Sequence, residues 1–179
     1  MTEKPNLKFV SWYILAVLVA AFLFIRQYVF PEISSFPEKV PDGLMFYSSD
    51  ELFDIIGNYS AKEIRGYIVA SLSFDIIYPL IYGTMLFVLI SLVFRLLKLK
   101  SKWVLMVSCL PFISTFLDYS ENVILIFMLK KLPEFNENLA SFVGFITMFK
   151  YLFIGISVIA AMIVVNYTIS YRIRHSVKK

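Results

Sequence analysis

Four ionisable side chains lie inside stretches that are otherwise apolar: Asp75, Asp118, Glu121 and Lys150. On insertion scales, such a charge at the centre of a membrane helix costs ~2.5–3.5 kcal/mol, so these groups must pair or meet water. Lys150 is the natural partner of Asp118 or Glu121. Three carboxylates then face one lysine, which predicts either a protonated carboxyl or a bound cation. Arg26 could supply a second positive charge, although snorkelling to the interface accounts for it equally well.

Helical spacing groups further polar side chains with these four, since residues three, four and seven apart share one face of a helix. Three polar stripes are expected on three helices: Ser71, Asp75, Tyr78 and Tyr82; Ser114, Thr115, Asp118, Glu121 and Asn122; Thr147, Lys150 and Ser157. The depth of each ionisable residue can be counted from the outer end of its helix at ~1.5 Å per residue. All four are then expected at a similar depth, between the middle of the membrane and its outer surface. We therefore predict one buried site, whose candidate ligand or ion-binding residues are Asp75, Tyr78, Tyr82, Asp118, Glu121, Asn122, Thr147 and Lys150.

The residue types that this site lacks narrow its chemistry. The only histidine, His175, lies near the C-terminus, and Cys109 is the only cysteine, so neither a zinc site nor an internal disulfide is expected. The sequence contains no glycine-rich phosphate loop and no serine in a nucleophile elbow. No metal and no cofactor is therefore predicted.

Three functions remain open for the site. The favoured one is binding or movement of a proton, a cation, or a small polar or lipid ligand, because ionisable residues inside membranes usually mark functional sites. The second is a structural or partner-binding protein in which the polar cluster joins helices. The third is an intramembrane enzyme acting on a lipid, with Asp118 and Glu121 as acid and base.

The elements that would carry this site are four long apolar segments. Of the 179 residues, 59% are hydrophobic and 17% are charged, whereas a soluble domain has ~45–50% and ~25%. Each segment is long enough to cross a ~30 Å hydrocarbon layer. We predict one all-α domain (residues 1–179), an up-down-up-down four-helix transmembrane bundle. Its helices are expected at about 9–30, 61–98, 103–130 and 139–171, with an outer loop at 31–60 and a tail at 172–179.

The distribution of Lys and Arg predicts the orientation of the bundle. Residues 95–102 carry four basic side chains and no acid, and residues 172–179 carry four more, whereas residues 31–66 carry seven acids against three basic residues. The chain is therefore expected to be a multi-pass protein of the plasma membrane, with both termini in the cytoplasm. These basic edges also explain the net charge of +4, so the expected partner is the lipid bilayer and not a nucleic acid. A homo-oligomer is left open.

The loop between the first two segments contains a helix signature, "SSDELFDIIG". Ser48 and Glu51 fit a capping box, in which a hydroxyl and a carboxylate satisfy free backbone N–H groups. Leu52, Phe53 and Ile56 are expected to share the apolar face of a short amphipathic helix that ends at Gly57. A second capping box, Ser60 with Glu63, predicts that the second long helix begins at residue 61.

The combination "RGY…FDIIYPLIYG…DYSEN…TMFK" resembles small four-helix membrane proteins of bacteria that have no assigned activity. The resemblance covers the second to fourth segments. It implies a four-helix fold but no activity, and it assigns a role to no residue. The four-helix thiol oxidoreductases of membranes are set aside, because this chain lacks their cysteine pairs.

Overall fold

The computed structural model describes residues 11–29, 36–97, 102–134 and 136–176, and all regular structure within these ranges is helical. Helix α1 (Trp12–Phe24) continues into a π-helical turn (Ile25–Val29), α2 (Ser49–Ile56) is short, and α3 (Ala61–Leu96), α4 (Lys102–Lys131) and α5 (Glu137–Ser176) are long. A 3₁₀ turn, η3 (Pro41–Gly43), precedes α2.

Four of these helical segments are long and apolar enough to cross a membrane: Trp12–Val29, Ala61–Leu96, Val104–Lys131 and Glu137–Tyr167. The all-α class and the number of membrane-length segments predicted from the sequence are thus confirmed. The predicted ends near residues 9, 30 and 98 fall outside the described residues. Helix α5 continues to Ser176, well into the segment predicted as a tail.

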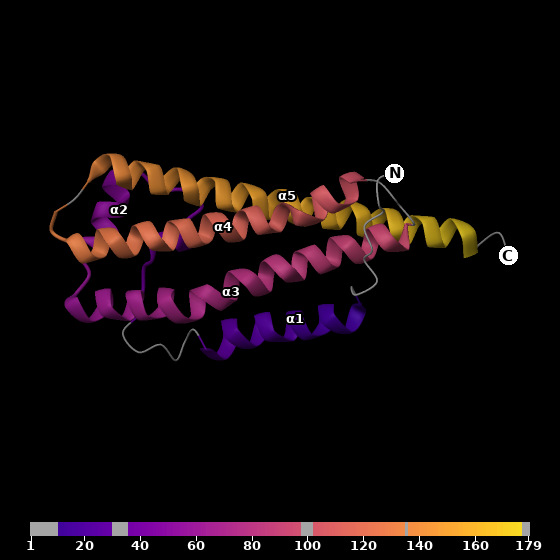
Figure 1. Cartoon of the computed structure of the whole chain (residues 1–179), viewed down its shortest axis with the longest axis horizontal. Coiled ribbons are helices and arrows are strands. Elements are labelled where there is room, and N and C mark those ends of the chain that lie inside the picture. The colour runs from indigo at the N-terminus through magenta and orange to yellow at the C-terminus, as the bar shows by residue number, and fades with distance from the viewer. Residues whose placement is uncertain (1–10, 30–35, 98–101, 135, 177–179) are drawn as a thin grey trace.

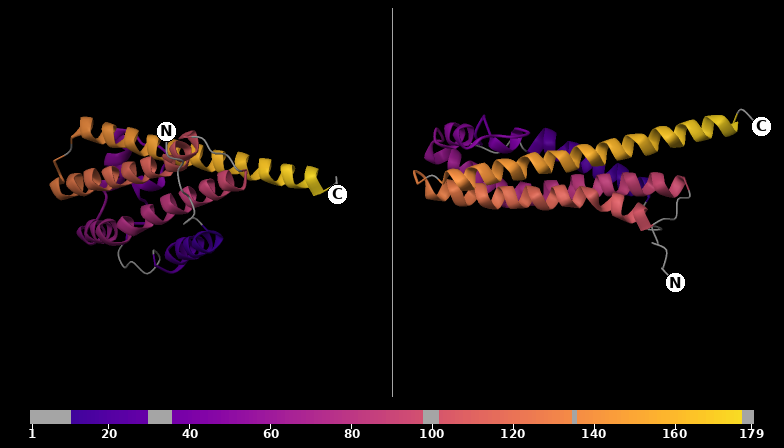
Figure 2. Two further views of the ribbon diagram at one scale, coloured as in Figure 1. Left: turned by 45° about the vertical axis from the view of Figure 1, so that its right-hand side comes forward. Right: turned by 90° about the horizontal axis from the view of Figure 1, so that it is seen from above.

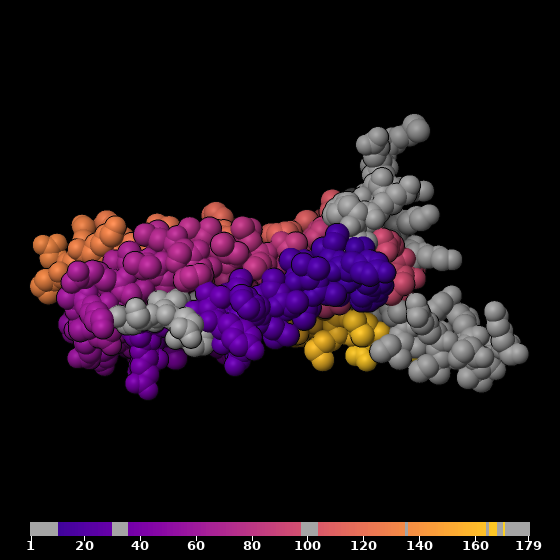
Figure 3. All heavy atoms as spheres, turned by 90° about the horizontal axis from the view of Figure 1, so that it is seen from below, coloured from indigo at the N-terminus to yellow at the C-terminus, as the bar shows by residue number. Residues whose placement is uncertain are grey.

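Helices α3, α4 and α5 pack against one another, and α1 packs on α3 at the edge of the bundle (Figures 1 and 2). No residue of α1 is buried, because one side of this helix touches α3 and the rest is exposed (Figure 3). In the part of the chain that the structure describes, α1 and α5 do not form a packed pair. The exposed surfaces of the helices are rich in large apolar side chains, as is typical of helices that could cross a membrane.

One end of the bundle is covered by α2 and by the segment before it, residues 36–48, which we call the strap. We refer to this end as the loop end. Beneath α2, buried apolar residues from the strap and from α2 to α5 form the main core: Tyr47, Leu52, Ile55, Ile56, Tyr67, Leu125, Met128, Leu129, Ala140 and Val143. The loop end is therefore a packed cap and not a loose connection.

Both predicted capping boxes are present. Ser48 and Glu51 begin α2, and Ser60 and Glu63 begin α3, each with the two reciprocal hydrogen bonds that the motif requires. At the end of α2, the N–H of Gly57 bonds to the carbonyl of Phe53.

The predicted apolar face of α2 is wrong in one position. Phe53 is 47% exposed, whereas Ile55 is 4% exposed and packs in the core with Leu52 and Ile56. Leu52, Ile55 and Ile56 follow the three- and four-residue spacing of one helical face. Phe53 lies about 100° further around the helix from Leu52 and points away from the bundle.

Close contact between α3 and α4 fixes their alignment near Pro79. The hydroxyl of Thr115 lies 3.0 Å from the carbonyl oxygen of Pro79, and the hydroxyl of Tyr119 lies 2.6 Å from that of Ile76. A side chain at Gly83 would collide with the hydroxyl of Thr115, so only glycine permits this approach. The two helices that carry Asp75 and Asp118 are thereby held together at the level of these carboxylates.

Candidate functional site

Lys150 lies between two carboxylates of the neighbouring helix. Its Nζ is 2.9 Å from Oδ1 of Asp118 and also bonds to Oε2 of Glu121. Lys150 is 4% exposed and Glu121 is fully buried. The sequence suggested a pair with Asp118 or Glu121, and in the structure Lys150 pairs with both.

The Glu121 side of this ion pair is closed off from its surroundings. Oε1 of Glu121 accepts hydrogen bonds from Thr147 (2.6 Å) and from Tyr47 of the strap (3.3 Å). Burial raises the pKa of Tyr47, and the nearby Glu121 carboxylate adds a smaller effect in the same direction. The Tyr47 hydroxyl therefore stays protonated and available as a donor. Glu121 of α4 thus has partners on α5 and on the strap, and its hydrogen bonds join these three parts of the chain.

The Asp118 side faces a cavity of about 530 Å³. Its walls come from α1, the strap, α3, α4 and α5, and they contain the following residues: Phe22, Arg26, Phe36, Val40, Asp42, Gly43, Asp75, Tyr78, Tyr82, Met85, Leu86, Asp118, Lys150, Tyr151, Ile154 and Val158. This volume is within the ~300–1,000 Å³ typical of small-molecule sites. We call it the central cavity.

The wall formed by α3 is acidic and aromatic. The hydroxyl of Tyr82 lies 3.4 Å from Oδ2 of Asp118. Tyr78 stacks on Phe22 of α1 at 5.1 Å and meets Tyr82 edge-on at 5.9 Å. Asp75 is only 9% exposed, and no hydrogen bond or ion pair joins it to another described residue.

The strap contributes a carboxylate that the sequence analysis missed. Asp42 lines the central cavity, its Oδ1 is buried, and that oxygen has no partner among the described residues. The backbone carbonyl of Asp42 accepts a hydrogen bond of 2.8 Å from the hydroxyl of Tyr151 on α5. Burial raises the pKa of Asp42 above its ordinary value of 3.8, an effect that nearby Lys150 opposes and Asp118 reinforces.

The predicted site residues therefore fall into two groups. The central cavity is lined by Asp75, Tyr78, Tyr82, Asp118 and Lys150. Glu121 and Thr147 lie behind it, in the hydrogen-bonded group described above, and Asn122 is 6% exposed with an Oδ1 that has no partner among the described residues. Glu121, Asn122 and Thr147 do not line the cavity.

Two of the remaining members of the predicted stripes bond within their own helix. The hydroxyl of Ser114 bonds to the carbonyl of Pro111 and that of Ser157 bonds to the carbonyl of Phe153, one turn back on the same helix. The hydroxyl of Ser71 is buried and has no partner in the described part of the chain. None of the three lines the central cavity.

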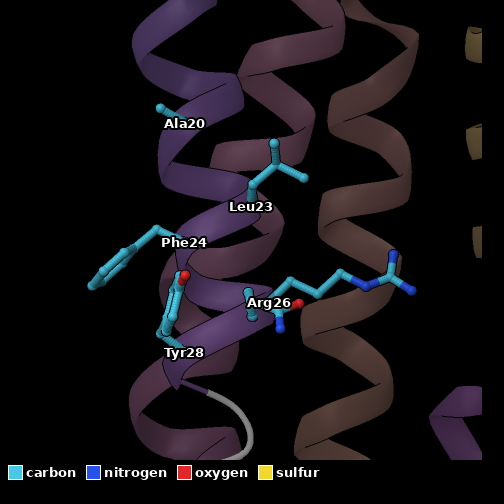
Figure 4. A pocket seen from close by; sticks show the side chains of 6 residues that line it. Ala20, Leu23, Phe24, Arg26 and Tyr28 are labelled. Carbon is cyan, nitrogen blue, oxygen red and sulfur yellow. The ribbon is translucent and has the colours of Figure 1, made fainter.

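Arg26 lines the cavity from the π-helical turn that follows α1 (Ile25–Val29). It also borders a second hollow, formed by side chains of α1 and of this turn, among them Leu23, Phe24 and Tyr28. Figure 4 shows its side chain extending away from α1 on the side opposite Phe24. Arg26 is exposed, in contrast to the buried Lys150.

The charges of the site do not balance. Asp42, Asp75, Asp118 and Glu121 stand against Lys150 and Arg26. Within the described residues, no group of three or more His, Cys, Asp or Glu side chains is arranged to hold a metal ion. Comparison of the chain with family models, with curated proteins and with solved structures finds no match. The function must therefore be inferred from the geometry of the cavity itself.

Proposed function

We propose that the protein spans a membrane four times and binds an amphiphilic, lipid-like molecule in the central cavity. The headgroup would lie at the loop end and the hydrocarbon chain would point toward the opposite end. The observation that carries the proposal is a gradient in the cavity wall, which changes from charged to apolar in the same direction along three helices.

The gradient can be followed residue by residue. Along α3, the lining begins with Asp75 and ends with Met85 and Leu86, roughly 16 Å further from the loop end. Along α5, it begins with Lys150 and ends with Val158, roughly 12 Å further in the same direction. A free ion or a small polar solute would have no use for the apolar half, whereas an amphiphile matches both halves.

The same gradient appears along α1 and the π-helical turn that continues it, which run antiparallel to α3 (Figure 1). Arg26 lies nearer the loop end, and Phe22 follows one turn deeper. Because α1 and α5 both line the cavity without packing on each other, a lateral entrance between them fits a ligand that arrives from the bilayer. Apolar side chains flank this side, including Val19 on α1 (38% exposed) and Ile159 on α5 (58% exposed).

Binding can be tested with a fluorescent alkyl probe and purified protein in phosphatidylcholine nanodiscs. Ile154→Trp would fill the apolar half of the cavity, and loss of contact with two methylenes, at ~0.8 kcal/mol each, corresponds to about 15-fold weaker binding. Ile156→Trp is the matched control, since Ile156 is 41% exposed on the same helix and does not line the cavity. Equal binding by both variants, or no saturable binding by the unchanged protein, would overturn the proposal.

We further propose that both termini face the cytoplasm of a cell whose plasma membrane holds the protein, so that the strap lies outside. The support is the excess of Lys and Arg in residues 95–102 and 172–179. In a Cys109→Ser background, a membrane-impermeant maleimide added to intact cells should label Asp50→Cys on α2 but not Lys179→Cys. Labelling of Lys179→Cys alone would reverse the orientation.

A separate observation favours a structural role for Glu121 and the residues bonded to it. Glu121 is fully buried and its carboxylate oxygens already bond to Tyr47, Thr147 and Lys150. A carboxylate enclosed in this way holds α4, α5 and the strap together, and it does not face the cavity. The geometry therefore gives no support to an acid–base pair of Asp118 with Glu121.

A further inference from the structure

The charge distribution in the central cavity selects the kind of headgroup that it can hold, provided that the proposed amphiphile binding is correct. Among the described residues that line the cavity, Lys150 is the only buried cation, and its ammonium group is already bonded to Asp118 and Glu121. An anionic headgroup would have to displace one of these carboxylates and would itself lie beside Asp118. Lys150 therefore offers little attraction to an anion.

Two carboxylates, by contrast, have oxygens without a partner among the described residues. Asp75 is 9% exposed, lines the cavity and has no hydrogen bond or ion pair with a described residue. Oδ1 of Asp42 is buried without a partner among those residues. Buried carboxylate oxygens are nearly always hydrogen-bonded in folded proteins. Two carboxylates with unpartnered oxygens on one cavity therefore indicate that the ligand carries a hydrogen-bond donor.

The aromatic residues of the lining favour the same sign of charge. Phe22, Tyr78 and Tyr82 form a continuous cluster through the ring contacts at 5.1 and 5.9 Å. Aromatic faces attract ammonium groups within about 6 Å of the ring centroid. Lys150 already makes one such contact, with its Nζ 5.2 Å from the centre of the Tyr151 ring.

From these three observations, we infer that the central cavity binds an amphiphile whose headgroup carries an ammonium group. The ammonium lies between Asp42 on the strap and Asp75 on α3, against the rings of Tyr78 and Tyr82. Asp118 stays with Lys150, and Arg26 remains at the open side, where it contacts water or lipid. The hydrocarbon chain follows Met85 and Val158 toward the opposite end of the bundle.

The inference can be tested with three amphiphiles of equal chain length: tetradecylamine, tetradecanol and tetradecanoic acid. Each is added at a known mole fraction to phosphatidylcholine nanodiscs that contain the protein, and the displacement of a neutral fluorescent alkyl probe is measured. We expect the amine to displace the probe at a mole fraction at least tenfold below that of the alcohol, and the acid to be the weakest competitor.

Three variants test the assigned carboxylates. Asp75→Asn and Asp42→Asn should each reduce the ratio between amine and alcohol displacement about tenfold, because each removes one charge that faces the ammonium. Asp54→Asn is the control, since Asp54 is an exposed carboxylate on α2 outside the cavity, and it should leave the ratio unchanged.

The possible outcomes separate the two proposals. If the alcohol or the acid displaces the probe as well as the amine does, the ammonium inference is overturned while amphiphile binding stands. The same conclusion follows if the ratio is identical in Asp75→Asn, Asp42→Asn and Asp54→Asn. If none of the three amphiphiles displaces the probe, the proposed function itself fails, and the ammonium inference falls with it.

Discussion

Replacement of Lys150 by methionine tests whether the buried ion pair determines the stability of the bundle. Methionine preserves most of the side-chain volume but leaves Asp118 and Glu121 without their shared cation. Glu121 suffers most, because it is fully buried and keeps only the hydroxyls of Thr147 and Tyr47 as partners. Removing one partner of a buried ion pair costs about 3–5 kcal/mol. In membranes, an average interhelical polar contact contributes only ~0.6 kcal/mol, with a maximum near 1.7.

The matched control is Thr147→Val, which removes a neutral donor from the same Glu121 carboxylate. We expect it to cost about 0.6–1.7 kcal/mol, clearly less than Lys150→Met. The double variant Lys150→Met/Glu121→Gln should recover much of the stability, since it removes the charge that the single variant strands. Thermal unfolding in a mild detergent, followed by loss of the monodisperse folded species, measures all three.

The expected shifts in melting temperature can be worked out. A change of 1 kcal/mol moves the midpoint of a chain of this size by roughly 2–4 °C, so Lys150→Met should lower it by about 6–20 °C and Thr147→Val by about 1–7 °C. Equal shifts for the two single variants would refute the argument that a stranded charge dominates. A double variant as unstable as Lys150→Met would refute it independently, because the cost would then not depend on the charge of Glu121.

Three further predictions concern the strap. Gly144→Ala would place a methyl group against the Tyr47 carbonyl and should cost about 1–3 kcal/mol, whereas Gly155→Ala on the same helix meets open space and should be neutral in the same unfolding assay. Since burial raises the pKa of Asp42, the folded state binds more protons than the unfolded state. Without ligand, the contribution of Asp42 to stability should therefore fall as pH rises from about 4 through the raised pKa, and Asp42→Asn should reduce the slope of stability against pH. Tyr151→Phe removes the hydrogen bond to the Asp42 carbonyl and should speed amide exchange at residues 42–44, and unchanged exchange would contradict this role.

Local signals in the sequence predicted the helices well. The capping boxes at Ser48 and Ser60 fixed the starts of α2 and α3, because each motif is completed within four residues. Hydrophobic length predicted the long helices for the same reason, since a helix satisfies its own backbone within each segment. Helical spacing also grouped Asp118 with Glu121 on one face of α4, and both carboxylates bond to Lys150 of α5.

Spacing alone could not divide the polar cluster into its two halves. Asp118 and Glu121 are three residues apart, which places them about 60° apart around α4. This angle is small enough to assign them to one stripe, yet it turns Asp118 toward the cavity and Glu121 toward Thr147 and Tyr47. Only the positions of the neighbouring helices decide which of the two carboxylates remains accessible.

The contributions of the strap could not be predicted from spacing at all. Tyr47 bonds to Glu121 across 74 residues of sequence, and Tyr151 bonds to the Asp42 carbonyl across 109. In the sequence, Asp42 stands in a Pro-Asp-Gly turn, a position where an aspartate usually serves the turn itself. The fold of the strap over the cavity gives this residue a second role that no local pattern encodes.

The difference between the two halves of the cluster bears on whether its polar groups serve only to hold the helices together. Groups retained for helix association should satisfy one another, since an unpartnered buried polar group costs about 1–3 kcal/mol. Glu121 meets this condition, with Lys150, Thr147 and Tyr47 around it. Asp42 and Asp75 do not meet it: both line the central cavity, Oδ1 of Asp42 has no partner among the described residues, and no hydrogen bond or ion pair joins Asp75 to another described residue. Association of the helices therefore accounts for the first half of the cluster. The proposed ligand, which would supply the missing donors, would account for the second.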